Sequence, residues 1–440
     1  MHPLKTTLLA LTLLALPCRA QHGDAHASHG PKQDKTTPGV ASLDVFTTPG
    51  GQLHLLLARR QPGHPAALEY LRSTDGGRTW SSPVAVGQGQ PAPSPVHRGQ
   101  DAQIAAAGDR LVAAWTTAGT VDRFGRGPIA TAYSHDGGRT WKPGPNPADD
   151  GQASGHAFID VAADSAGTFH LVWLDGRDRE KAAAATPNPA RPTPSPLTPS
   201  SPHPLTSTPT TQPAAKGLRY ARSTDGGQTW QPNLTLDPAT CECCWNTIAL
   251  GPDNRLSVLY RDRDPRDMSI IHSKDGGQSW GKPVPTGAFG WQIEGCPHVG
   301  GGLAFAPDDP STAHAVVWTA KGTGAQGAYV LSTADGGQTW TTPRQLGNDP
   351  RSWHTDLAAG PRGHVATVWD AYTDDGGAIF AATSKDNGRT WSPPQRLSPP
   401  DASATHPRVL WSDGKFQVFW TQSPSDGGPA TWKAVPLNPR

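Results

Sequence analysis

The chain has 440 residues and a formal net charge of +1, from 38 Lys and Arg against 37 Asp and Glu. This balance leaves no global positive field to hold nucleic acid or an anionic membrane. Glycine and proline together make up about a fifth of the residues, and 16 residues are tryptophan. Long helices tolerate Gly and Pro poorly, so the composition excludes an all-helical or Rossmann-type fold. It favours many short strands joined by tight turns.

Residues 1–20 predict an export signal. His2 and Lys5 precede an apolar run from Leu8 to Leu16, and the Cys-Arg-Ala at 18–20 offers a small-residue cleavage pattern. The run is too short to span a membrane. A lipid anchor on Cys18 is the alternative to cleavage. We therefore expect an exported protein, periplasmic or extracellular, with no membrane span.

Two segments of the exported chain lack the residues needed for a core. Residues 21–38 are polar and contain three histidines, which predicts a disordered leader or, alternatively, a weak metal-collecting tail. Residues 182–215 are rich in Pro, Thr and Ser, which predicts a mobile insertion. The rest of residues 39–440 is expected to fold as one unit.

One octapeptide recurs six times in this folded part. Successive copies are 50 to 61 residues apart, except for one interval of 89 that contains the 182–215 insertion. In each copy an Asp can accept backbone N–H bonds, Gly allows a positive φ, and the Trp can pack under a neighbouring sheet. The copies are Ser73–Trp80, Ser134–Trp141, Ser223–Trp230, Ser273–Trp280, Thr333–Trp340 and Ser384–Trp391.

A two-stranded hairpin precedes each octapeptide, and a seventh hairpin starts near His406. Repeats of about 50 residues that cannot bury both faces alone predict an all-β propeller with four-stranded blades and a shared core. Seven hairpins predict seven blades. A six-bladed ring with an added closing hairpin is the alternative. Because alternate loops share a face, the loops that enter the first strand and leave the second lie opposite the octapeptide turns.

The octapeptides resemble the Asp-box, or bacterial neuraminidase repeat, so the chain resembles the sialidase superfamily of propellers. Sialidases clamp a substrate carboxylate with three arginines and use a Tyr nucleophile, a Glu partner and an Asp acid/base. The resemblance implies a glycoside hydrolase of the exo-α-sialidase type. Its Arg-Ile-Pro motif is missing from the first inner strand, which reads ASLDVFTTP from Ala41. The candidates for such catalysis are Asp101, Glu294, Tyr372, Arg177 and Arg261.

The residues just before the inner strands carry a second type of chemistry. Two neighbouring blades bring four cysteines and four blades bring a histidine to similar places, and we expect these side chains to meet at the mouth of the channel. The candidate metal ligands are His156, Cys241, Cys243, Cys244, Cys296, His298, His354 and His406. Aspartates 44, 101, 160 and 356 also recur near the starts of inner strands, where they could cap backbone groups around the channel.

The cysteines allow two interpretations. An exported protein with an even number of cysteines can form disulfides, for example from Cys296 to Cys241, Cys243 or Cys244. Thiolates and imidazoles together also suit copper or zinc. The leading hypothesis is a metal-binding propeller that acts in storage, delivery or a redox reaction. A glycoside hydrolase and a non-catalytic scaffold that binds a glycan or protein are the alternatives, and we expect a monomer.

Overall fold

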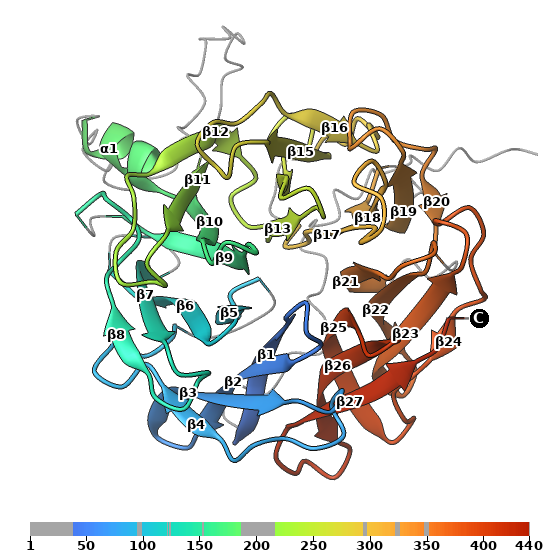
Figure 1. Ribbon diagram of the computed structural model, residues 1–440, viewed down its shortest axis with the longest axis horizontal. Coiled ribbons are helices and arrows are strands. Elements are labelled where there is room, and N and C mark those ends of the chain that lie inside the picture. Colours follow the sequence, from blue (N-terminus) through green and yellow to red (C-terminus); the bar gives the residue numbers. More distant parts are fainter. Residues whose placement is uncertain are drawn as a thin grey trace, which may run out of the picture.

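The computed structural model describes residues 38–94, 99–120, 122, 125–151, 154–185, 216–293, 297–321, 326–346 and 352–439. The predicted export signal, all but the last residue of the predicted leader and nearly all of the predicted insertion lie outside these ranges. The described residues form seven antiparallel sheets arranged as blades around a central axis (Figure 1). The predicted all-β propeller with seven blades is therefore confirmed. In the part of the chain that is described, no helix has the length and apolarity to cross a membrane.

Each blade is a meander in chain order, with its first strand nearest the axis (Figure 1). Blades 1 to 3 contain β1 (Gly39–Thr47), β2 (Leu53–Gln61), β3 (His64–Ser73), β4 (Val84–Val86), β5 (Gln103–Ala107), β6 (Arg110–Ala118), β7 (Arg126–Ser134), β8 (Lys142–Gly144), β9 (His156–Ala163), β10 (Phe169–Asp175), β11 (Lys216–Ser223) and β12 (Leu234–Thr240). A helix, α1 (Arg177–Ala185), follows β10.

The remaining blades repeat this order, except that the seventh has three strands. Blades 4 to 7 contain β13 (Thr247–Leu250), β14 (Leu256–Arg261), β15 (Met268–Ser273), β16 (Val284–Thr286), β17 (Gly302–Phe305), β18 (Ala313–Thr319), β19 (Gly327–Thr333), β20 (Arg344–Gln345), β21 (Ser352–Ala359), β22 (Val365–Thr373), β23 (Gly376–Ser384), β24 (Gln395–Arg396), β25 (Ala402–Ser412), β26 (Lys415–Pro424) and β27 (Thr431–Leu437).

The second strand of each blade is buried on both faces, because each blade is packed between two others. All seven residues of β10 and all seven of β18 are buried. These strands accordingly read as nearly continuous apolar runs such as FHLVWLD, rather than as a strict alternation. Their burial removes apolar surface from water at both blade interfaces, which is the main stabilisation of the ring.

The octapeptides form the turns between the third and fourth strands, as predicted. In the first copy, Asp75 Oδ1 accepts the Thr79 N–H at 2.9 Å and Oδ2 accepts the Thr79 hydroxyl at 2.6 Å. The Ser73 hydroxyl accepts the N–H of Gly77, whose φ of +84° is readily adopted only by glycine. The side chains thus satisfy the turn's backbone donors.

The predicted packing of the octapeptide tryptophans is also confirmed. Trp141 of blade 2 meets Tyr70 of blade 1 edge-on, with ring centroids 5.5 Å apart. Trp80 of blade 1 meets Trp432 of blade 7 at 5.4 Å in the same way. Each of these indoles therefore joins its own blade to the preceding one, and the second contact joins the two ends of the ring.

The backbone also joins the first and seventh blades. Gly39 and Ala430 form a parallel bridge, in which the Val40 N–H donates to the Ala430 carbonyl at 2.8 Å. A side chain at Gly39 would overlap the Ala430 backbone, so this contact requires glycine. Blade 7 lacks an octapeptide, and the strand expected after its hairpin is β27.

Carboxylates on the inner strands connect neighbouring blades around the axis. Asp44 accepts the N–H of Ile104 at 2.8 Å. Asp160 accepts that of Ile248 at 2.8 Å, and Asp356 that of Val409 at 2.9 Å. In each case the donor lies in the inner strand of the next blade, which is β5, β13 or β25. The capping role predicted for these aspartates is confirmed at three of the four positions.

Asp101 differs from the other three aspartates. Three of the aspartates occupy the same register position, opposite an apolar residue of the second strand: Asp44 opposite Leu56, Asp160 opposite Val172 and Asp356 opposite Val368. In blade 2 that position is held by Gln103, which pairs with Ala114. The expectation that Asp101 shares this position was wrong by two residues. The equivalent residue of blade 7 is Arg408, which forms an ion pair with Asp44 at 3.2 Å. This buried guanidinium offsets part of the negative charge around the axis.

Candidate functional site

Three cysteines gather in the loop that leads from β12 into β13. Cys241 Sγ lies 3.1 Å from Cys244 Sγ and 3.9 Å from Cys243 Sγ, and all three sulfur atoms lie within 4.8 Å of one another. We call these three residues the thiol cluster. All three side chains are buried, and Cys241 and Cys244 are free cysteines. Buried sulfur atoms at this spacing can share a metal ion or undergo thiol–disulfide chemistry.

Backbone contacts and an ion pair hold the cluster's loop in place. The Cys241 N–H donates to the Arg261 carbonyl at the end of β14, at 3.0 Å. Glu242, between two of the cysteines, accepts a hydrogen bond from Arg179 of α1 at 2.8 Å. Helix α1 itself begins where Asp175 accepts the Arg177 N–H at 2.9 Å, which caps the helix. The loop is therefore fixed to blade 4 on one side and to α1 on the other.

The two free thiols have opposite pKa shifts. Burial raises the pKa of the Cys241 thiol, but the Cys244 S–H and the guanidinium groups of Arg266 and Arg261 outweigh this, so its pKa lies below the usual range. Burial and the neighbouring Cys241 sulfur raise the pKa of Cys244. The pair therefore favours a thiolate on Cys241 hydrogen-bonded by the Cys244 thiol.

An apolar wall surrounds the thiol cluster. The cysteines pack in one hydrophobic cluster with Trp245, Trp291, Val299 and Trp318. Trp245 also donates its indole N–H to the Gly301 carbonyl at 3.1 Å. The wall keeps water from the sulfur atoms, and a low-dielectric setting strengthens the influence of nearby charges on them.

Two histidines and an aspartate meet where blades 6 and 7 adjoin. Asp370, in β22, accepts hydrogen bonds from His354 Nδ1 at 2.7 Å and the Thr405 hydroxyl at 2.6 Å. It also accepts the backbone N–H groups of His354 and His406, both at 3.0 Å. The two imidazole rings are 4.3 Å apart between centroids. We call His354 and His406 the histidine pair. The His354 side chain is 21% exposed, so solvent reaches it.

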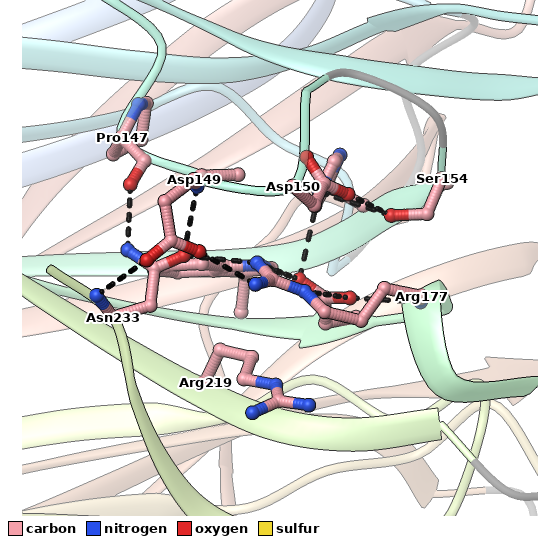
Figure 2. A network of polar contacts seen from close by, with 12 residues as sticks. Pro147, Asp149, Asp150, Ser154, Arg177, Arg219 and Asn233 are labelled. Carbon is pink, nitrogen blue, oxygen red and sulfur yellow. Dashed lines mark hydrogen bonds and ion pairs between the residues drawn. The ribbon is translucent and has the colours of Figure 1, made fainter. Parts of the chain in front are cut away.

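His156 lies in a different environment, in blade 3. Its Nε2 is 3.1 Å from Asp150 Oδ2 and 3.5 Å from Asp175 Oδ2, and its Nδ1 is 3.2 Å from the Gly127 carbonyl. The Ser154 hydroxyl bonds the same Asp150 carboxylate (Figure 2). These three titratable side chains also have a spacing that could hold a metal ion. The geometry equally suits a polar network in which the ring contacts Asp150 and the Gly127 carbonyl.

The contacts of Arg177 favour a polar network, rather than a metal site, at His156, Asp150 and Asp175. Its guanidinium donates to Asp175, to Asp149 and to Asn233, in the network drawn in Figure 2. The Trp173 indole N–H donates to Asp175 as well, at 2.8 Å. Both Asp175 oxygens therefore already have donors, which leaves little room for a cation there. We interpret this group as a buried polar network that anchors the start of α1.

The predicted single cluster at the channel mouth is therefore divided among separate groups. The thiol cluster, the histidine pair and His156 each have their own partners. His298 lies half-buried just before β17, with a φ of +53°. Cys296 and Glu294 lie outside the described residues. One reason is geometric: β9, which carries His156, and β21, which carries His354, lie on different sides of the axis (Figure 1).

The residues predicted for glycoside hydrolysis are engaged within the protein. Arg261 is buried, with Nε donating to the Val299 carbonyl at 3.0 Å and Nη2 to that of Trp318 at 2.8 Å. Arg177 has the carboxylate partners described above. Both guanidinium groups are therefore occupied by partners within the protein.

The predicted nucleophile and acid/base also have unsuitable surroundings. Burial, together with the Asp370 charge, raises the pKa of Tyr372, whereas a tyrosine nucleophile needs activation. Asp101 is buried, and its Oδ2 accepts the Gly99 N–H at 3.2 Å. The Asp101 contact gives that residue a role in the fold.

Sequence reasoning missed the carboxylates that organise these groups. Asp370 directly follows Trp369 in β22, and Asp175 lies two residues after Trp173 in β10. An acidic residue next to the second-strand Trp was the available signal. It places a carboxylate at the end of the strand, opposite the octapeptides, where inner-strand histidines can reach it.

Comparisons with known proteins agree with the fold. The model of the BNR/Asp-box repeat matches residues 132–143 and 221–232. No curated protein matches the chain. A PL25 ulvan lyase, a polysaccharide lyase, is similar in structure with a TM-score of 0.56 at 9% identity, over 92% of this chain and 95% of that one.

Two sialidases are also similar in structure. The Hadza microbial sialidase Hz136 has a TM-score of 0.46 at 17% identity, over 85% of this chain and 74% of that one. The NanB sialidase of Streptococcus pneumoniae has a TM-score of 0.46 at 13% identity, over 93% and 70%. Fold likeness at these identities carries no activity with it. The chain is a seven-bladed β-propeller with BNR/Asp-box repeats.

Proposed function

We propose that this exported propeller binds a thiophilic transition-metal ion, copper or zinc, at the thiol cluster. The observation that carries the proposal is a pair of buried free thiols, Cys241 and Cys244, whose sulfur atoms lie 3.1 Å apart. Soft thiolate ligands select Cu(I) and zinc over hard cations. The buried, apolar setting also limits the access of water and oxidants to the ion. Storage or delivery of the ion is the role that such a shielded site supports.

The charges around the cluster favour Cu(I). Two thiolates and one Cu(I) ion together carry a net charge of −1, which the nearby Arg261 and Arg266 guanidinium groups would stabilise. These same charges already lower the pKa of Cys241, so one ligand is deprotonated at little cost. Copper(I) also tolerates a low coordination number.

The third cysteine has a separate role in the proposal. Cys243 is a disulfide cysteine, in contrast to the two free ones. We propose Cys296 as its partner, since Cys18 belongs to the predicted export signal. The disulfide would brace the loop, while Cys241 and Cys244 bind the ion. Export to an oxidising compartment fits this combination.

Metal analysis of the natively exported protein tests the proposal. We expect close to one equivalent of copper or zinc, lost in the Cys241→Ser/Cys244→Ser double variant. Asp401→Ala is the control, because it changes an exposed residue outside the thiol cluster and keeps every cysteine, and it should retain the metal. Less than a few tenths of an equivalent in the native protein would contradict the proposal and favour a scaffold that binds a glycan or protein. Thiol counting should give two free thiols before reduction and four after it.

A further inference from the structure

We propose that the histidine pair, oriented by Asp370, is a second metal site, distinct from the thiol cluster and exposed to solvent. The proposal deepens the proposed function, because it names where an ion could first bind before it reaches the buried thiols. It takes a divalent ion that imidazole prefers and that keeps its oxidation state when it moves on to the thiols, such as Zn(II).

The orientation of His354 is the first observation. Its Nδ1 lies 2.7 Å from Asp370 Oδ2, so Nδ1 carries the proton and Nε2 is the basic nitrogen. A carboxylate behind the imidazole is the arrangement found around metal-binding histidines, where it fixes the tautomer and makes the ligand more basic. Asp370 also receives the Thr405 hydroxyl at 2.6 Å, so the carboxylate is itself held in place.

The second imidazole is close enough to share the ion. The His354 and His406 rings are 4.3 Å apart between centroids. Asp370 accepts the backbone N–H groups of both residues at 3.0 Å, which fixes both Cα positions around one carboxylate. His406 holds a φ of +57°, a conformation that is uncommon outside glycine. Two imidazoles from adjacent blades thus lie side by side around the Asp370 carboxylate.

Access and position distinguish this site from the thiols. The His354 side chain is 21% exposed, whereas the thiol cluster is buried. The Trp245 ring, next to Cys244 in the chain, is 5.9 Å from the His354 ring between centroids. Trp245 therefore lies between an accessible nitrogen site and a buried sulfur site. Ligand exchange from one to the other involves no electron transfer when the ion keeps its oxidation state, as zinc does.

The first test isolates the nitrogen site. The Cys241→Ser/Cys244→Ser protein is titrated with Cu(II), because without these thiols the ion is not reduced by them. We expect one equivalent to bind with nitrogen hyperfine structure in its electron paramagnetic resonance spectrum. Adding His354→Gln should abolish that signal, and adding Asp370→Asn should weaken binding 10–100-fold. His364→Gln, which changes a histidine at the octapeptide end of blade 6, is the matched control and should leave binding unchanged.

The second test uses Co(II) on the protein with all its cysteines and keeps the two proposals apart. Thiolate charge-transfer bands report the thiol cluster, and we expect them to appear at least 10-fold more slowly in His354→Gln, with unchanged final intensity. If those bands never appear but the nitrogen signal does, the thiol proposal fails alone. If the Cys-substituted protein shows no nitrogen ligands, or if His354→Gln binds as tightly as its parent, the histidine site is refuted. His406→Gln provides a second variant should His354→Gln fold poorly.

Discussion

Removal of the Asp370 carboxylate should destabilise the propeller by far more than a typical surface substitution. Asp370 is buried and accepts four hydrogen bonds, from the His354 ring, the Thr405 hydroxyl and the backbone N–H groups of His354 and His406. The Thr405 hydroxyl and the backbone N–H groups of His354 and His406 have limited access to water. Each buried donor left unpaired costs about 1–3 kcal/mol. We therefore expect Asp370→Ala to lower the free energy of unfolding by about 3–5 kcal/mol.

Asp370→Asn gives a graded comparison. An amide oxygen at the Oδ2 position could still accept three of the four bonds, and only the His354 backbone N–H at Oδ1 would lose its acceptor. The expected loss is about 1–2 kcal/mol. Urea unfolding followed by tryptophan fluorescence measures both variants, and the exposed Asp401→Ala should change stability by less than about 0.5 kcal/mol. A loss below about 1 kcal/mol for Asp370→Ala, or equal losses for Ala and Asn, would refute the reasoning.

The pH dependence of the same carboxylate has a definite sign. Burial alone would raise the pKa of Asp370, but the adjacent His354 and His406 rings and its hydrogen bonds hold the pKa below the ordinary value. A depressed folded-state pKa contributes stability that is complete above about pH 4 and is lost as the pH falls further. The stability difference between wild type and Asp370→Asn should therefore shrink as the pH falls below about 4.

Two further predictions concern the ring itself. Gly277→Ala should lower stability by several kcal/mol, because the new Cβ would overlap the Tyr220 hydroxyl and the backbone has a φ of +81°. The neighbouring Gly276→Ala has open space around its Cβ and a φ of +67°, so it should lower stability by only about 1–2 kcal/mol. Equal losses for the two variants in thermal unfolding would count against the packing described. Burial raises the pKa of Asp160 to about 7, so its contribution to stability is greatest below about pH 4 and declines as the pH rises to about 7. Asp160→Asn should flatten that decline in urea unfolding measured from pH 4 to 8, and an unchanged slope would contradict it.

The sequence was sufficient to predict the ring because the ring is periodic. Six octapeptides and seven hairpins at regular spacing predict blades, and local turn chemistry such as that of Asp75 is encoded within eight residues. The tryptophan contacts followed from the same repetition. The aspartates of β1, β9 and β21 were also recognised as caps, since their positions recur.

The candidate site was less predictable because register and blade order decide which side chains meet. Asp101 was assigned to the position that Gln103 occupies, a difference of two residues that only the strand pairing reveals. His156 and His354 have similar places within their blades, yet blades 3 and 6 are not neighbours. Asp370 was not predicted because it lies in a second strand, whereas the predicted metal ligands lie before or within the first strands. Only the thiol cluster, encoded within four consecutive residues, was identifiable from the sequence as a group.

X-ray absorption at the metal edge of the copper- or zinc-loaded protein tests the central proposal most directly. We predict nearest neighbours dominated by sulfur, at about 2.3 Å for zinc, and the loss of this sulfur scattering in Cys241→Ser/Cys244→Ser. Nearest neighbours made only of nitrogen and oxygen, or a protein that retains no metal after removal of excess ions, would contradict a metal site at the thiol cluster.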